Sequence, residues 1–188
     1  MTTPSTAELK SATRHAITEQ VNTLSGAEKH LASLSIVRQL NDWVMQQHDV
    51  KTVAIYAALE NEPQLEQLHQ LADGINFVYP LTQDSNGAMQ FHLVHEISEL
   101  RHGRYGILEP HPEHHPLVAA DRIDTFICPG IAFSATGLRL GKGGGYYDRI
   151  LESRKQDAHI LGVAFQCQVL DHLPTEDHDI QMDAVISA

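Results

Sequence analysis

The sequence is poor in cysteine, in long apolar runs and in basic residues. Its two cysteines, Cys128 and Cys167, lie in apolar segments, which fits buried thiols in a reducing compartment and excludes a disulfide framework or a structural zinc motif. The longest apolar stretch, Val53 to Leu59, falls far short of the roughly 20 residues that cross a bilayer. The polar start also lacks the apolar region of a signal peptide. We therefore expect a cytoplasmic protein with no membrane partner.

Charge sets a further limit, because 24 acidic residues outnumber 13 basic ones and give a formal charge of -11. This balance opposes binding to a nucleic-acid backbone, so we expect no nucleic-acid partner. An anionic ligand would need a small, locally positive pocket. The 188 residues, 42% of them hydrophobic, contain no repeat or linker, and we expect one domain over residues 1–188.

Histidine is abundant, with 13 residues in total. His111, His114 and His115 lie in the run E-P-H-P-E-H-H-P, where three prolines exclude a regular helix and predict a loop. One interpretation is a metal site and the other is a solvated loop. The spacing favours the loop, because it places no fixed pair of imidazoles on one face of a regular element.

Apolar periodicity predicts an α/β domain. Helices are expected over residues 5–21 and from Ser25 onward, where S-G-A-E forms a capping box with Glu28. Trp43 is expected to anchor the second helix to the core. A short helix is expected around residues 65–71 and a turn at 83–87. Strands are expected over 52–59, 75–79 (ended by Pro80), 89–94, 122–128 and 160–165.

The segment from Gly137 to Arg149 reads G-L-R-L-G-K-G-G-G-Y-Y-D-R and holds five of the 12 glycines. Glycines before a helix let backbone amides approach a phosphate closely, while Arg139 and Lys142 add positive charge. The spacing is not that of a Walker A loop. The segment therefore indicates a phosphate-bearing ligand, and a flexible surface loop is the alternative.

Three charged residues extend this hypothesis. Asp148 follows the glycines, where it could hold a Mg²⁺ carried by phosphates or simply favour the start of a helix. Lys10 and Arg14 are four residues apart on one helical face, where they could clamp an anion or be solvated. The spacing leaves both pairs of alternatives open.

Taken together, several motifs resemble the 5-formyltetrahydrofolate cyclo-ligase family, also called 5,10-methenyltetrahydrofolate synthetases. They are K-x-x-x-R at Lys10, N-E at Asn61, Y-G-I-L-E-P at Tyr105, P-G-I-A-F at Pro129, and R-L-G-K-G-G-G-Y-Y-D from Arg139. The resemblance implies a three-layer αβα sandwich with a mostly parallel sheet, similar to the sugar-phosphate isomerase and CoA-transferase group. It also implies ATP- and Mg²⁺-dependent closure of 5-formyltetrahydrofolate to 5,10-methenyltetrahydrofolate, with release of ADP and phosphate. Separately from the resemblance, we expect a monomer.

The resemblance also implies roles for individual residues. ATP would be bound by the basic and glycine-rich positions Lys10, Arg14, Arg139, Leu140, Gly141, Lys142, Gly143, Gly144, Gly145, Tyr146 and Tyr147. Among these, Arg139, Lys142 and Tyr147 would be catalytic, chiefly by placement and charge neutralisation. The folate would be bound by Glu62, Tyr105 and Tyr146, and Mg²⁺ by Asp148 and Asp183.

Two positions depart from the family pattern. Pro63 and Gln64 follow Glu62 where the family usually has an aliphatic residue and threonine, and Lys142 occupies a variable position. Two other functions therefore stay open: a regulator that binds folate or nucleotide without turnover, and an ATP-dependent enzyme acting on a different amide-like substrate.

Overall fold

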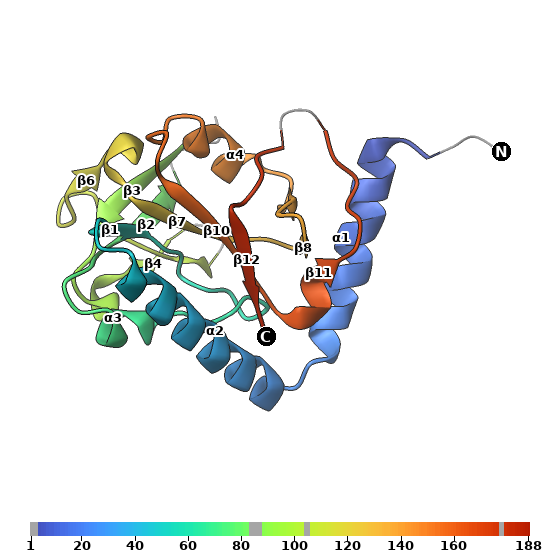
Figure 1. Cartoon of the computed structure of the whole chain (residues 1–188), viewed down its shortest axis with the longest axis horizontal. Helices are drawn as coiled ribbons and strands as arrows, with labels where there is room; N and C mark the ends of the chain where they lie inside the picture. The colour runs from blue at the N-terminus through green and yellow to red at the C-terminus, as the bar shows by residue number, and fades with distance from the viewer. Residues whose placement is uncertain (1–3, 83–87, 104–105, 177–178) are drawn as a thin grey trace.

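A seven-stranded sheet forms the centre of the protein in the computed structural model, which describes residues 4–82, 88–103, 106–176 and 179–188 (Figure 1). Five neighbouring strands are parallel, and two antiparallel strands complete one edge. In spatial order they are β12 (Ala184–Ser187), β10 (His159–Ala164), β7 (Thr125–Pro129), β1 (Thr52–Ala54), β2 (Asn76–Thr82), β3 (Met89–Leu93) and β6 (Leu117–Val118). This confirms the predicted α/β class with a mostly parallel sheet.

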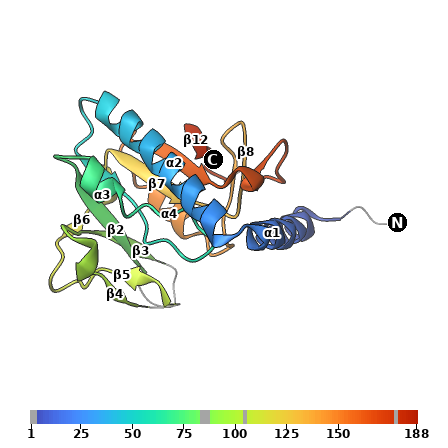
Figure 2. The same cartoon turned by 90° about the horizontal axis from the view of Figure 1, so that it is seen from below.

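Helices cover both faces of the sheet. α2 (Gly26–Gln46) and α3 (Leu68–Leu71) pack on one face, and α4 (Tyr146–Leu151) packs on the other (Figure 2). Strand β7 shows why both faces are apolar: Ile127 joins the cluster under α2, whereas Phe126 and Cys128 join the cluster under α4. Helix α2 begins as expected, with the Ser25 and Glu28 capping box.

A smaller sheet extends the domain beside the main one. Its strands are β11 (Val169–Leu170), β8 (Ala132–Ser134) and β9 (Arg139–Leu140), with β8 in the middle. Helix α1 (Thr6–Thr23) lies next to β8 in Figure 1 and packs Ile17 and Val21 against Ala132 and Leu140. Residues 141–145, the centre of the glycine-rich segment, thus lie between β9 and α4.

The remaining elements are short. They are β4 (Arg101–His102) paired with β5 (Leu108–Glu109), and the 3₁₀ turns η1 (Ile97–Glu99), η3 (Ala120–Arg122) and η4 (Gln166–Gln168). No helix in the described ranges is both long and apolar enough to cross a membrane.

Three predicted strand boundaries were wrong. β7 begins at Thr125 instead of Arg122, because residues 120–122 form a 3₁₀ turn. β1 stops at Ala54 instead of Leu59, and β2 continues through Pro80 to Thr82. The main-chain groups of successive strand residues point to opposite sides, and those of Tyr79 point to β3. Those of Pro80 therefore point to the side of β1, which has already ended at Ala54. The missing N–H of Pro80 thus removes no hydrogen bond of the sheet. The predicted turn at residues 83–87 lies outside the described residues.

Trp43 is partly buried, and its ring meets that of His159 edge to face at 5.0 Å between centroids. The histidine-rich loop forms neither helix nor strand over residues 111–116, as predicted. His115 is buried there, and its carbonyl lies 2.7 Å from Nδ1 of His92. Within the described part of the chain, no cluster of three or more His, Cys, Asp or Glu side chains is arranged to hold a metal ion. Of the three loop histidines, His115 is thus packed inside, whereas His111 and His114 are exposed.

Candidate active site

A cavity of about 720 Å³ opens at the carboxyl ends of the parallel strands. Its walls include Tyr56 after β1, Thr82 at the end of β2 and Pro129 at the end of β7. The whole stretch from Arg139 to Asp148 also lines it. Ligands of open α/β sheets bind at this edge, where the loops that follow the strands converge.

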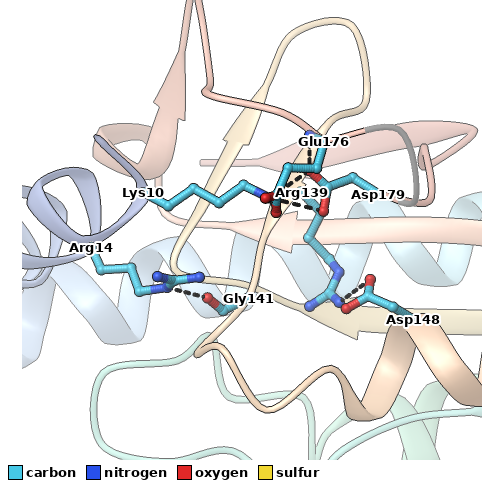
Figure 3. Close-up of polar contacts among 7 residues, drawn as sticks. All are labelled: Lys10, Arg14, Arg139, Gly141, Asp148, Glu176 and Asp179. Atoms are coloured by element: carbon cyan, nitrogen blue, oxygen red, sulfur yellow. Dashed lines mark hydrogen bonds and ion pairs between the residues drawn. The ribbon is translucent and has the colours of Figure 1, made fainter. Parts of the chain in front are cut away.

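Arg139 is the most deeply held cation of the cavity, with a side chain only 6% exposed. Its guanidinium donates to the Asp148 carboxylate at 3.0 Å (Figure 3). It also donates to the carbonyl of Pro129 at 3.2 Å and lies over the Tyr147 ring at 5.3 Å. These contacts fix the guanidinium plane against the cavity wall. The structure thus joins the predicted phosphate ligand to the predicted metal ligand.

Lys10 reaches across from α1 to the loop that precedes β12. Its ammonium lies 2.8 Å from carboxylate oxygens of both Glu176 and Asp179 (Figure 3). Burial alone would lower the pKa of Lys10, but the hydrogen bonds to Asp179 and Glu176 outweigh it and the pKa is raised. Lys10 therefore stays charged at physiological pH.

Arg14 contacts the glycine-rich segment directly. Its Nε donates to the carbonyl of Gly141 at 2.8 Å, and its guanidinium lies close to Gly143. Gly143 and Gly145 have φ values of 98° and 64°, in the region that favours glycine. Helix α4 has only six residues, so its dipole contributes less than the sequence suggested, and the basic side chains carry most of the local positive charge.

Lys142 and Glu62 form an ion pair of 2.6 Å between Nζ and Oε1. The other carboxylate oxygen of Glu62 accepts the backbone N–H of Leu59 at 2.9 Å. The Glu62 side chain is 10% exposed and that of Lys142 is 53% exposed. The predicted folate ligand and one predicted phosphate ligand are therefore bonded to each other.

Of the described residues, three tyrosines line the cavity: Tyr56, Tyr146 and Tyr147. Burial raises the pKa of Tyr56 and of Tyr147 well above the ordinary value, so both hydroxyls stay protonated at neutral pH. Tyr56 donates its hydroxyl to the carbonyl of Pro63 at 3.0 Å. Tyr146 packs its ring 5.5 Å from the guanidinium of Arg149. These side chains offer rings and hydrogen-bond donors instead of a general base.

The predicted positive pocket needs a correction. Among the residues that the structure describes, four basic side chains line the cavity, and five acidic ones accompany them: Glu62, Glu109, Asp148, Glu176 and Asp179. Most of the basic groups are thereby already neutralised, so the cavity is a network of paired charges. A triphosphate entering it would need additional positive charge, which a divalent cation provides.

Two predicted residues are not brought into this network. Asp183 is absent from the described cavity lining; its carboxylate accepts the N–H of Ile160 at 2.7 Å, near the start of β10. Ile160 pairs with Phe126, which lies three residues before the cavity-lining Pro129. Asp183 therefore binds at the part of β10 that is distant from the cavity, and the structure does not place it beside Asp148. Tyr105 lies outside the described residues.

Sequence reasoning missed several cavity residues. Glu176 and Asp179 belong to the same acidic run as Asp183, and that run was the available signal. Glu109 lies within a motif that the resemblance used without giving it a role, and its buried carboxylate faces the N–H of Thr82 at 3.4 Å.

Comparison with known proteins identifies relatives of this chain. The 5-formyltetrahydrofolate cyclo-ligase of Escherichia coli K12 is 34% identical over 141 residues, covering 72% of this chain and 77% of that protein. The protein of the same name from Haemophilus influenzae is 27% identical over 163 residues, covering 85% and 87%.

Solved structures of 5,10-methenyltetrahydrofolate synthetases share the fold of this chain. A 5,10-methenyltetrahydrofolate synthetase from Mycoplasma pneumoniae superposes with a TM-score of 0.78 at 26% identity, covering 94% of this chain and 97% of that one. The Aquifex aeolicus protein of that name gives 0.82 at 29% identity, covering 95% and 89%. The family model described as the 5-formyltetrahydrofolate cyclo-ligase family matches residues 6–188, and the chain belongs to this enzyme family.

Proposed function

We propose that this chain converts 5-formyltetrahydrofolate to 5,10-methenyltetrahydrofolate with consumption of ATP and release of ADP and phosphate. The observation that carries the proposal is the single cavity in which Lys10, Arg14, Arg139 and Asp148 surround the glycine-rich segment beside Glu62. Anion-binding groups and an acceptor for ring N–H groups thus line one space, as a reaction between a nucleotide and a folate requires.

The donor set fits Mg²⁺. Asp148 and Asp179 present carboxylates to the same cavity, and Mg²⁺ is usually held by one or two carboxylates together with substrate phosphates and water. We therefore assign Asp148 and Asp179 as the residues that would hold it, in place of the predicted pair with Asp183. When bound, the cation would neutralise phosphate charge during phosphoryl transfer.

The side chains then act mainly by placement and charge. A formamide oxygen is a poor leaving group, so the reaction must convert it to a phosphate ester before N10 attacks the formyl carbon and phosphate departs. Arg139, with its guanidinium fixed by Pro129 and Tyr147, would stabilise charge on the transferred group. Arg14 and Lys10 would bind the remaining phosphates. The protonated Tyr147 would support Arg139 without taking a proton.

Purified protein mixed with 5-formyltetrahydrofolate, Mg²⁺ and ATP should produce the absorbance of the methenyl product. Product formation should require all three components, and ADP should appear in equal amount. ATP binding without any product would instead indicate a non-catalytic regulator. ATP hydrolysis stimulated by another amide, but not by 5-formyltetrahydrofolate, would indicate a different substrate.

A further inference from the structure

Lys142 differs from the other basic side chains of the cavity in its partner. Lys10 contacts the loop before β12, Arg14 contacts Gly141, and Arg139 contacts Asp148. The ammonium of Lys142 instead contacts Glu62 at 2.6 Å. Among the ion pairs of the described residues, this one alone involves Glu62, whose side chain is 90% buried. A carboxylate buried to this degree is held in place by such a partner.

This ion pair also lies between two cavities. A second space of about 310 Å³, bounded by Ile17 and Val21 of α1, shares both Glu62 and Lys142 with the main cavity. The pair therefore forms part of the boundary between them. Loss of the Lys142 ammonium would free Glu62 to turn and would open the boundary toward the smaller space.

The Glu62 carboxylate can accept more hydrogen bonds than the ion pair with Lys142 uses. An ionised carboxylate offers about four lone-pair positions, two on each oxygen. Lys142 occupies one position on Oε1, and the N–H of Leu59 occupies one on Oε2. With respect to the described residues, one position remains on each oxygen, which suits two parallel N–H donors, as on the amide and amino groups of a pterin ring.

From this geometry we infer that Lys142 is a positioning residue for the folate: it holds the Glu62 carboxylate so that both oxygens can accept the ring, and it does not serve as a phosphate ligand. The inference rests on the proposed function, since it presumes a folate at Glu62. It replaces the phosphate-binding and catalytic roles that the resemblance implied for Lys142.

The test compares Lys142→Met, which keeps the length of the side chain and removes its charge, with Lys142→Arg, which keeps the charge. Isothermal titration with 5-formyltetrahydrofolate in the absence of ATP gives Kd, and steady-state assays give KM for each substrate. Lys142→Met should raise the Kd and KM for the folate about tenfold, the loss expected for one charge-assisted hydrogen bond. Its KM for ATP should change less than about twofold, and Lys142→Arg should recover most of the folate affinity.

Lys155→Met is the matched control. Lys155 makes an ion pair of the same 2.6 Å length with Asp124, another carboxylate that accepts backbone N–H groups, but this pair lies outside the cavity lining. This variant should keep wild-type folate affinity even where it lowers the melting temperature. Circular dichroism and thermal unfolding of all variants separate loss of fold from loss of affinity.

A second comparison isolates Glu62. In a Glu62→Gln background, Lys142→Met should change folate affinity by less than about twofold, because the group that Lys142 positions has lost its charge. An undiminished tenfold effect there would overturn the inference. So would a Lys142→Met variant whose KM rises for ATP alone, or whose folate Kd is unchanged.

Failure of the proposed function would look different. If the wild-type protein binds 5-formyltetrahydrofolate but forms no product, the catalytic proposal fails, and the Kd values still decide the role of Lys142. If the wild-type protein does not bind the folate, both proposals are overturned together.

Discussion

Asp148 and Asp124 provide a pair of substitutions that separate catalysis from stability. Asp148 contacts Arg139 in the cavity and is 31% exposed, whereas Asp124 contacts Lys155 and is 16% exposed. Asp148→Asn keeps the shape of the side chain and an oxygen for Arg139, but removes the charge that would hold Mg²⁺. We expect kcat to fall by about 100-fold or more, because one electrostatic group acting on the transition state contributes roughly 3 kcal/mol.

The stability cost of Asp148→Asn should be small. The Asp148 carboxylate is 31% exposed, and the asparagine oxygen can still accept a hydrogen bond from the buried Arg139. The cost should therefore stay at about 1 kcal/mol, which corresponds to a melting temperature lower by roughly 2–4 °C in a protein of this size. Asp124→Asn should show the opposite pattern. Asp124 accepts the N–H groups of Lys51 and Thr52 at 2.7 Å and the Lys155 ammonium at 2.6 Å. Loss of these charge-assisted bonds should cost about 2 kcal/mol and roughly 4–8 °C, with kcat retained.

The assay measures methenyl product formation at saturating MgATP and, in parallel, thermal and urea unfolding of both variants. A kcat for Asp148→Asn within about threefold of wild type would refute the assignment of Asp148 to the cation. Equal activity losses in the two variants would refute the claim that the cavity geometry, and not general stability, determines turnover.

The other predictions concern acid stability, Tyr147 and Gly162. Burial acts to raise the pKa of Asp124, but the hydrogen bonds from Lys155 and the backbone outweigh it, and the pKa is lowered. The Asp124 carboxylate therefore stabilises the fold above about pH 4. This contribution is lost as pH falls through the lowered pKa. Urea unfolding measured between pH 7 and pH 2 should thus show a weaker pH dependence for Asp124→Asn, and an unchanged slope would contradict this. Tyr147→Phe should keep kcat within about fivefold of the wild-type value, because the tyrosine hydroxyl stays protonated and the phenylalanine ring still supports Arg139. A loss of about 100-fold or more in steady-state assays would show that the hydroxyl takes part in the chemistry. Gly162→Ala would place a methyl group 2.5 Å from the Phe133 ring inside the core, so the unfolding free energy should fall by about 1–3 kcal/mol, and an unshifted urea midpoint would show that the ring can move aside.

Local signals made much of the fold predictable. The Ser25 capping box marked the start of α2 correctly, and the alternation of apolar residues located β3 and β10 to within a residue or two. The end of β1 could not be found in this way. Residues 56–59 are as apolar as a strand, but they leave the sheet, and Tyr56, Ala57 and Leu59 line the cavity. Apolar content does not distinguish a strand from such a loop.

The site was predictable where its residues are close in sequence. The glycine-rich segment places Arg139, Asp148 and their neighbours within ten residues, and the structure lines one cavity with them. Lys10 is separated from Glu176 and Asp179 by 166 and 169 positions, and no local pattern reports such a contact. The same limit affects Asp183, since an acidic run does not reveal which carboxylate faces the cavity and which caps a strand.

The contact between Lys10 and the loop before β12 ties α1 to residues that lie 166 and 169 positions further along the chain. A nascent chain with α1 and the glycine-rich segment already folded would still lack the carboxylates that complete the site. Ligands that bind this cavity stabilise only the folded state. They should therefore protect α1 and the segment near β12 from proteolysis together, since opening either one disrupts the same binding site.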